Sequence, residues 1–367
     1  MKRIAIVGAG NAGCITALEL KNRFPSTQCE ITIYHSPKKH PIEKVGQGTL
    51  PNITQLVQNM LDVDWYNNYI DATIKTGILY EGWGKKQDKI FHSFLPGNTA
   101  FHFVPEKLSN LTLESGLFNV EEKIIYNPEQ EIDSDIIFDC RGRHNRDKNN
   151  YDTLISPINS VLLGKRLRLE SDHDLIYTRA VATPNGWTFI IPNKDTVSYG
   201  YLYNNSVTSK HDASEDFIER FDIHRVDNYI TFDNYAAKNM FVGDRTILQG
   251  NAYGFIEPLE ATTITFYREV CLQANNVIFY GKDPYEINRD IRKKIQGIET
   301  FLLWHYQFGS KYDTPFWEYA KNLPFSPEDS IFTNNNVNIK SIPEIWQEAE
   351  WSLSHKDWLE DMPRTKN

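Results

Sequence analysis

The feature of this sequence that most restricts its fold is a glycine turn close to the N-terminus. Residues 4–7 (IAIV) form a short apolar run typical of a buried strand, and Gly8, Gly10 and Gly13 follow it in the spacing G-x-G-x-x-G. The next ten residues have the apolar spacing of a helix, and residues 31–34 predict a second strand. This order predicts a β-α-β unit that binds the pyrophosphate of a dinucleotide at its helix N-terminus. The alternative is a glycine turn with a structural role alone.

Later segments predict an α/β protein with an inserted sheet. Residues 135–140 (DIIFDC) have the pattern of a buried strand, and residues 247–254 predict a strand that enters a glycine turn. Three segments between them predict antiparallel strands separated by turns, at residues 177–182, 187–191 and 197–203. We therefore expect one domain over residues 1–265 with an antiparallel β-sheet lobe at about 160–205. A mainly helical C-terminal region over residues 266–367 follows.

Composition excludes several classes of function. A chain of 367 residues with 40% hydrophobic residues can bury a large core. Its net charge of -9 argues against a protein that follows nucleic-acid phosphates. The sequence has no apolar run long enough to span a bilayer, and its four cysteines form no CxxC pair. We expect a cytoplasmic protein without a metal site that binds neither nucleic acid nor membrane.

Four further segments, in the same order along the chain, resemble the flavin-dependent tryptophan halogenases. VGQGTLPNI at 45–53 resembles the family's flavin-contacting strap VGEAT-x-PN, and DATIKTGILYEGW at 71–83 resembles the segment with the active-site lysine. NGWTFIIP at 185–192 is similar to W-x-W-x-I-P, and GNAYGFIEPLEATT at 250–263 is similar to GDAAGFIEPLESTG. The similarity extends to DTPFW, which ends at Trp317. It implies an FAD-binding Rossmann-like fold of the glutathione-reductase and aromatic-hydroxylase type.

The resemblance implies a set of residues that contact FAD. By family position they are Gly8, Gly10, Ala12, Gly13, His35, Val45, Gly46, Gln47, Thr49, Asn251, Gly254, Pro258 and Leu259. Two of them replace a carboxylate: His35 stands where an acid would bind the adenosine ribose, and Asn251 stands at the family's acid. A histidine can still form a hydrogen bond to a ribose hydroxyl, so we expect FAD to bind, but weakly.

The resemblance also implies a catalytic pair, Lys75 and Glu260. In the family's reaction, reduced FAD, oxygen and a halide form hypohalous acid, which travels through a channel to the substrate. The ammonium of Lys75 would donate hydrogen bonds to this oxidant, or its neutral amine would be halogenated. Glu260 would orient the oxidant or take the ring proton. The alternatives are a surface lysine on a half-polar strand and an acid that stabilises a helix start.

Family position also implies sites for the halide and the substrate. The amides of Thr262 and Thr263 at a helix start would hold a halide such as chloride or bromide. His92 and Phe94, in FHSFLPG, would hold a flat aromatic substrate by stacking, although a lone histidine is often a core residue. His102 and His305 also stand at positions where the family tends to have histidine, and we assign neither a catalytic role. Further departures from the family are Phe189 for its second tryptophan, Ala261 for serine, Thr263 for glycine, and a shorter C-terminal region.

These residues together predict an enzyme, an FAD-dependent halogenase of electron-rich aromatic compounds such as indoles, with tryptophan as one candidate. Because the sequence contains a single glycine fingerprint, we expect a separate flavin reductase to supply reduced FAD. A homodimer is compatible with the sequence. The rival predictions are a flavin-dependent aromatic monooxygenase and a flavin-binding protein without activity. The C-terminal region, with Trp346, Trp351 and Trp358, would complete the substrate pocket or form a helical lid.

Overall fold

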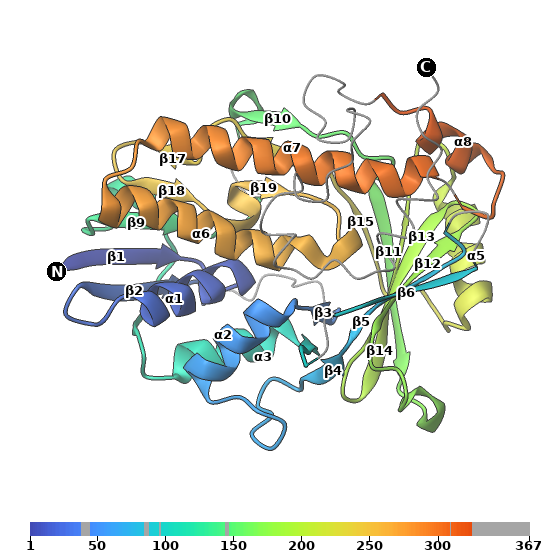
Figure 1. Cartoon of the computed structure of the whole chain (residues 1–367), viewed down its shortest axis with the longest axis horizontal. Coiled ribbons are helices and arrows are strands. Elements are labelled where there is room, and N and C mark those ends of the chain that lie inside the picture. The colour runs from blue at the N-terminus through green and yellow to red at the C-terminus, as the bar shows by residue number, and fades with distance from the viewer. Residues whose placement is uncertain (38–44, 84–87, 95–96, 144–146, 309, 325–367) are drawn as a thin grey trace.

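The N-terminal strand lies at the centre of a six-stranded, mainly parallel sheet (Figure 1). The computed structural model describes residues 1–37, 45–83, 88–94, 97–143, 147–308 and 310–324. Strand β1 (Lys2–Val7) pairs in parallel with β2 and β9, and the sheet has the order β17-β18-β9-β1-β2-β8. The other strands are β2 (Cys29–His35), β8 (Asn119–Glu122), β9 (Ile136–Asp139), β17 (Phe241–Val242) and β18 (Thr246–Leu248). The expected Rossmann-like arrangement is confirmed.

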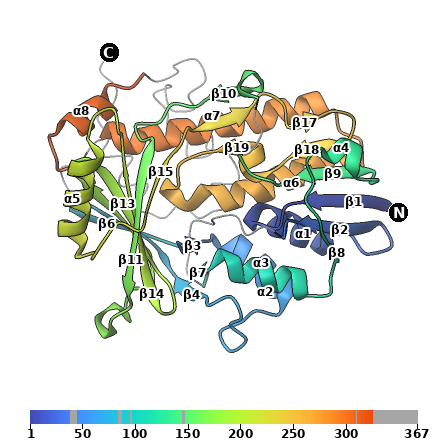
Figure 2. The same cartoon turned by 180° about the vertical axis from the view of Figure 1, so that it is seen from behind.

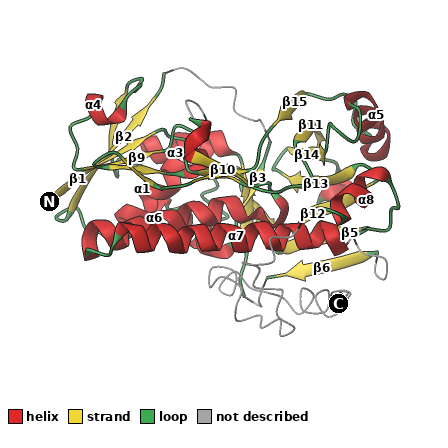
Figure 3. Cartoon of the chain, turned by 90° about the horizontal axis from the view of Figure 1, so that it is seen from above, coloured by secondary structure: helices red, strands yellow, loops and turns green. Residues whose placement is uncertain are grey.

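Long helices pack beside this sheet. Helix α1 (Asn11–Arg23) starts directly after the glycine turn and is buried from Ala12 to Leu20, because it contacts the sheet, α6 and α2. Helices α6 (Thr262–Tyr280) and α7 (Pro284–Phe308) run side by side, as Figure 3 shows. The shorter helices are α2 (Pro51–Leu61), α3 (Pro105–Glu114), α4 (Pro128–Glu131) and α8 (Pro315–Lys321). None of the described helices is long and apolar enough to cross a membrane.

The C-terminal helical region starts at Thr262, four residues before the expected boundary. Its helices share one apolar core with the rest of the chain. This core contains Ile6, Trp187, Ile298 and Trp317. Residues 325–367, with the three tryptophans expected at the substrate pocket, lie outside the described residues.

A second, seven-stranded sheet forms the other lobe (Figures 1 and 2). Its order is β15-β11-β14-β13-β12-β5-β6. These strands are β5 (Gly77–Glu81), β6 (Lys89–Ser93), β11 (Ser160–Leu167), β12 (Thr178–Thr183), β13 (Gly186–Pro192), β14 (Thr196–Tyr203) and β15 (Asn228–Thr231). Helix α5 (Lys210–Phe221) covers the sheet with its own apolar cluster around Tyr201 and Phe217. The sheet extends beyond the expected 160–205 segment, because β5 pairs in parallel with β12.

Two small sheets complete the fold, and one of them connects the lobes. The connecting sheet has the order β3-β7-β4, formed by β3 (Gln47–Gly48), β7 (Ala100–Phe103) and β4 (Thr73–Lys75). The other consists of β10 (Tyr151–Thr153), β16 (Tyr235–Ala237) and β19 (Gly254–Phe255). Pairing with β7 places the strap residues of β3 and the lysine at the end of β4 in one sheet.

Candidate active site

The glycine turn has the geometry of a phosphate-binding loop. Gly8 has φ +112°, and a Cβ there would lie 2.6 Å from the carbonyl oxygen of Cys140. A Cβ on Gly13 would lie 1.9 Å from the carbonyl oxygen of Gly8, so only glycine fits where the helix meets the strand. A Cβ on Gly10 would meet no atom within 4 Å, and no side chain caps α1. The open side at an uncapped helix N-terminus fits a phosphate group.

The neighbouring FAD-contact candidates lie around this turn. The Cβ of Ala12 fits closely against Gly250, where an added Cβ would lie 2.3 Å from it. His35 is the last residue of β2, next to the turn, and it is half-buried beside Glu122 of β8. Its position is that of a ribose-binding residue after the second strand.

The strap at residues 45–50 is held at both ends by hydrogen bonds. The amide of Gly46 donates to the Ser198 hydroxyl at 3.1 Å, and Asn193 donates to the same hydroxyl at 2.8 Å. A Cβ on Gly46 would lie 1.8 Å from Asn193 Oδ1, so the strap passes close to the second sheet. Gln47 Oε1 accepts a hydrogen bond from Asn11 Nδ2 at 2.6 Å, which joins the strap to the start of α1.

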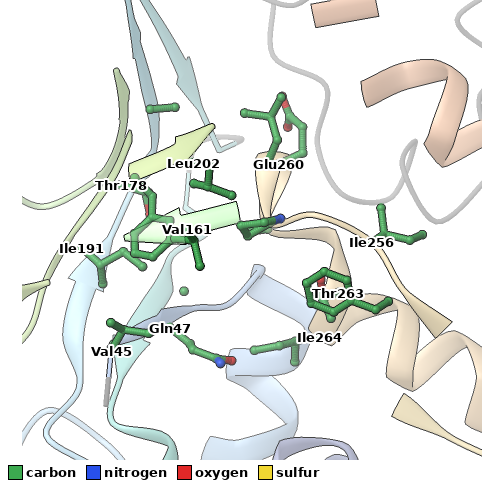
Figure 4. Close-up of a pocket in the computed structure, with 18 of the residues that line it drawn as sticks. Val45, Gln47, Val161, Thr178, Ile191, Leu202, Ile256, Glu260, Thr263 and Ile264 are labelled. Atoms are coloured by element: carbon green, nitrogen blue, oxygen red, sulfur yellow. The ribbon is translucent and has the colours of Figure 1, made fainter. Parts of the chain in front are cut away.

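A cavity of about 180 Å³ lies between the strap and the start of α6 (Figure 4). Val45, Gln47, Thr178, Ile191, Glu260 and Thr263 are on its walls, and Figure 4 shows them on opposite sides of the opening. Of the FAD-contact candidates, those that line it are Val45, Gly46, Gln47, Asn251, Pro258 and Leu259. Gly8, Gly10, Ala12, Gly13, His35, Thr49 and Gly254 do not line this cavity. The phosphate turn and the cavity are therefore separate parts of one elongated candidate site.

Asn251 and Gly254 come from the segment that follows β18. Asn251 Oδ1 accepts a hydrogen bond from the Tyr267 hydroxyl at 3.2 Å, and its carbonyl accepts one from Tyr235 at 2.7 Å. Gly254 lies in β19, where it pairs with Ala236 of β16. These contacts hold the segment beside the cavity without a carboxylate at position 251.

Lys75 is completely buried, which excludes the alternative of a surface lysine. Its Nζ donates a hydrogen bond to the carbonyl of strap residue Thr49 at 3.0 Å and lies 5.5 Å from the centre of the Phe94 ring. Thr49 is itself fixed, because its amide and hydroxyl both donate to the Phe101 carbonyl, at 2.9 and 3.0 Å. Burial lowers the pKa of Lys75 to about 7, and the nearby charge of Glu260 opposes this change. The amine is therefore partly neutral at pH 7.

Glu260 lies in the turn Leu259–Ala261 that precedes α6, and only 9% of it is exposed. Its Oε1 accepts a hydrogen bond from the Tyr80 hydroxyl and forms a second hydrogen bond with His305 Nε2 at 2.8 Å. Burial alone would raise the pKa of Glu260, but the hydrogen bond and charge of His305, with His92 and Tyr80, lower it. The α6 N-cap is Ala261 and has no side-chain cap, so the carboxylate does not cap this helix.

The two halide candidates are the first residues of α6. Thr263 lines the cavity, and Thr262 is 1% exposed. Within the described part of the chain, the buried hydroxyl of Thr262 has no hydrogen-bond partner. An unpaired buried hydroxyl at a helix N-terminus fits an anion.

The two substrate candidates lie on either side of the catalytic pair. Phe94 is buried, and its ring faces Lys75. His92, in β6, is buried and close enough to Glu260 for its charge to affect that carboxyl group. The structure thus brings Lys75, Glu260, His92 and Phe94 together from three segments of the chain, since Phe94 directly follows β6.

Sequence reasoning missed the partners of Glu260. The sequence assigns no role to Tyr80 and indicates only that His305 stands at a position where the family tends to have histidine. Both join a buried aromatic cluster with Trp83, whose ring centre lies 6.1 Å from that of Tyr80 and 6.2 Å from that of His305. The available signal was that Tyr80 follows Lys75 in the same segment and that His305 precedes DTPFW.

Comparisons with known proteins identify the family and the fold of the chain. The chain is 23% identical to a tryptophan 7-halogenase from Lentzea aerocolonigenes, over 88% of this chain and 79% of that protein. Its fold matches a flavin-dependent halogenase from Brevundimonas sp. BAL3 with a TM-score of 0.77 at 18% identity, over 89% of this chain and 83% of the other. A tryptophan halogenase from Shewanella frigidimarina NCIMB 400 matches with a TM-score of 0.75 at 19% identity, over 88% and 80%. The family model described as tryptophan halogenase matches residues 3–107 and 115–355, so the chain belongs to the tryptophan halogenase family of flavin-dependent halogenases.

Proposed function

We propose that this protein halogenates an electron-rich aromatic compound of the indole type, with FAD, oxygen and a halide. The observation that carries the proposal is the buried Lys75, which is bound to the strap by Thr49 and lies within electrostatic reach of Glu260. Folding must remove water from this buried cation, which costs free energy. Such a cost, at a residue with a charged partner, points to a functional site. The names of its relatives support the indole class, with tryptophan as the first compound to test.

The residues present fit FAD. The glycine turn would hold the pyrophosphate, His35 the adenosine ribose, and Val45, Gly46 and Gln47 the flavin beside the cavity. Thr49, Asn251, Gly254, Pro258 and Leu259 complete the FAD contacts, with Ala12 beneath the turn. When bound and reduced, FAD would give two electrons to oxygen, and the halide would give two more as it is oxidised to hypohalous acid. A separate flavin reductase would deliver it.

The chain's own groups would then act on the oxidant and the substrate. Thr262 and Thr263 would hold the halide at the start of α6. Lys75 would donate a hydrogen bond to hypohalous acid and so direct it to the aromatic ring, which His92 and Phe94 hold. The halogen adds to a ring carbon, and the C–H bond at that carbon then breaks, with its electron pair returning to the ring. The oxygen–halogen bond of hypohalous acid breaks as the halogen adds, and Glu260 would accept the ring proton and pass it to the hydroxide so released, which leaves as water.

Halide dependence separates this function from its rivals. The protein should be incubated with a flavin reductase, NADH and a panel of indoles and phenols, with chloride, bromide or iodide in turn. Mass spectrometry should find one compound whose mass increases by a halogen, with the isotope pattern of chlorine or bromine. A product that gains only oxygen would indicate an aromatic monooxygenase. No product with any halide, from protein that binds FAD, would favour a flavin-binding protein without activity.

A further inference from the structure

Two hydrogen-bonding side chains converge on one oxygen of Glu260. The Tyr80 hydroxyl comes from β5 and the His305 imidazole from α7, and both contact Oε1. Tyr80 is 1% exposed and His305 is 2% exposed. Oε2 makes neither of these contacts. Two hydrogen-bond partners from different elements define the direction of a carboxyl group far better than one partner does.

The backbone of α7 fixes the hydrogen on the other side of the imidazole. His305 Nδ1 lies 2.8 Å from the carbonyl oxygen of Phe301, one helical turn earlier. A carbonyl oxygen only accepts hydrogen bonds, so Nδ1 carries a hydrogen. The contact between Nε2 and Oε1 therefore contains a single hydrogen, bound to either the imidazole or the carboxyl group. Histidine and glutamate form one proton-holding unit, as a base and its orienting group do in other enzymes.

The turn that carries Glu260 is strained in a way that side-chain contacts must offset. Glu260 has φ +71° and Ala261 has φ +53°, and neither is glycine. Two successive residues in the left-handed region are unfavourable, so the surrounding structure must impose the conformation. The hydrogen bonds of Tyr80 and His305 to the Glu260 side chain are suited to this purpose.

We propose that His305, assisted by Tyr80, is the positioning residue of Glu260: it orients the carboxylate for removal of the ring proton and shares a hydrogen with it. The proposal rests on the halogenase function proposed above. His305 acts through Glu260 in this assignment and need not touch the substrate.

Four groups determine the ionisation of Glu260, each from a different element. They are His305 of α7, Tyr80 of β5, His92 of β6 and Lys75 of β4. The hydrogen bond of His305 opposes the effect of burial, which would otherwise raise the pKa of the carboxyl group. Without His305 the pKa of Glu260 should rise. Because Glu260 must be ionised to accept a proton, the acid limb of the pH–rate profile should move to higher pH.

Two substitutions at His305 test this role. His305→Leu removes the donor, whereas His305→Gln keeps an amide that can donate to Oε1 but cannot share a proton. We expect His305→Leu to lower kcat for halogenation about a hundredfold, with substrate KM and the rate of flavin oxidation unchanged. The acid limb of the pH–rate profile of His305→Leu should move to higher pH by about one unit or more. His305→Gln should have a kcat roughly tenfold higher than that of His305→Leu, because it restores the hydrogen bond.

Tyr80→Phe should lower kcat about tenfold with a smaller displacement of the acid limb than His305→Leu, since the hydrogen bond of this neutral donor lowers the pKa of Glu260 less than His305 does. Tyr203→Phe is its matched control, because Tyr203 is equally buried in the same sheet but belongs to the cluster beneath α5. Wild-type kcat and an unchanged pH profile in His305→Leu would overturn the proposal.

A measurement on the free protein separates this proposal from the proposed function. In NMR spectra of protein with ¹⁵N-labelled histidine, His305→Gln identifies the His305 signals. We expect an Nδ1-bound hydrogen that is retained in Glu260→Gln, and an Nε2 signal that shifts in this variant. If both hold but wild-type protein makes no halogenated product, the halogenase function fails and the paired unit stands. If halogenation occurs but Nε2 is unaffected by Glu260→Gln, the positioning role is wrong.

Discussion

Replacing Lys75 by methionine should change how the stability of the protein depends on pH. Lys75 is completely buried, and its pKa of about 7 in the folded state is far below the value of 10.5 for a free lysine. Between these two values the unfolded chain holds a proton that the folded protein lacks. The free energy of unfolding should therefore rise with pH across this window and reach its limit above pH 10.5.

The magnitude follows from the two pKa values. Each pH unit within the window contributes about 1.36 kcal/mol, so from pH 7 to pH 9 the wild type should gain about 2 to 3 kcal/mol relative to Lys75→Met. At pH 7 the desolvated amine costs the wild type about 4 kcal/mol. Methionine fills a similar volume and removes that cost. The lost hydrogen bond to the Thr49 carbonyl offsets about 1 to 2 kcal/mol, so the variant should be more stable at pH 7.

Urea unfolding at pH 7, 8 and 9 measures this difference, because titrations common to both proteins cancel when the two curves are subtracted. Lys165→Met is the matched control, since it removes an exposed lysine from strand β11. Equal m-values would show that the compared states bury similar surface. Parallel pH dependence of the wild type and Lys75→Met would refute the burial argument for this lysine.

The remaining predictions concern the proposed reaction and its cofactor. Lys75→Ala should still oxidise reduced flavin with oxygen but make no halogenated product, and product at the wild-type rate would end the assignment of Lys75. Glu260→Gln should lower the halogenation rate on the order of a hundredfold while FAD and substrate still bind, as titration can show; wild-type kinetics would leave Glu260 as a structural acid. FAD should bind and be lost during purification, because His35 and Asn251 each replace a carboxylate, whereas tight NAD binding without flavin binding would contradict the proposed site. Gly46→Ala should weaken FAD binding at least tenfold, because its Cβ would lie 1.8 Å from Asn193 Oδ1 and either the strap or the Asn193 side chain must move; unchanged affinity would contradict a strap that is held in place by this contact and binds the flavin.

Local pattern was enough to predict most of the fold. The run of residues 4–7, the glycine turn and the second strand correspond to β1, α1 and β2, because each signal lies within a short stretch of chain. The three antiparallel strands were also predicted close to their observed bounds. The membership of β5 and β6 in the same sheet was not predicted, because the pairing of β5 with β12 joins residues about 100 positions apart. Nothing in the local sequence specifies such a partner.

The candidate site was predicted by resemblance, but its environment was not. The sequence left a surface lysine on a half-polar strand as the alternative for Lys75, whereas the structure buries this lysine completely. The contact of Tyr80 with Glu260 spans 180 residues, and that of His305 spans 45. Hydrogen bonds of this kind depend on how lobes pack, so neither periodicity nor residue type indicates them.

The two residues assigned to catalysis are those at which the chain departs most from favourable local structure. A lysine without solvent and a glutamate with left-handed backbone geometry each lower stability, the backbone strain by about 1 to 3 kcal/mol for each residue affected. Neither departure improves the packing of the fold, since methionine would fill the space of Lys75 and glycine would relieve the turn at 260 or 261. Glu260 lines the cavity, and Lys75 lies within electrostatic reach of this carboxylate. Their coincidence is what selection for chemistry rather than for stability would produce, and it favours an active enzyme over a flavoprotein that has lost its activity.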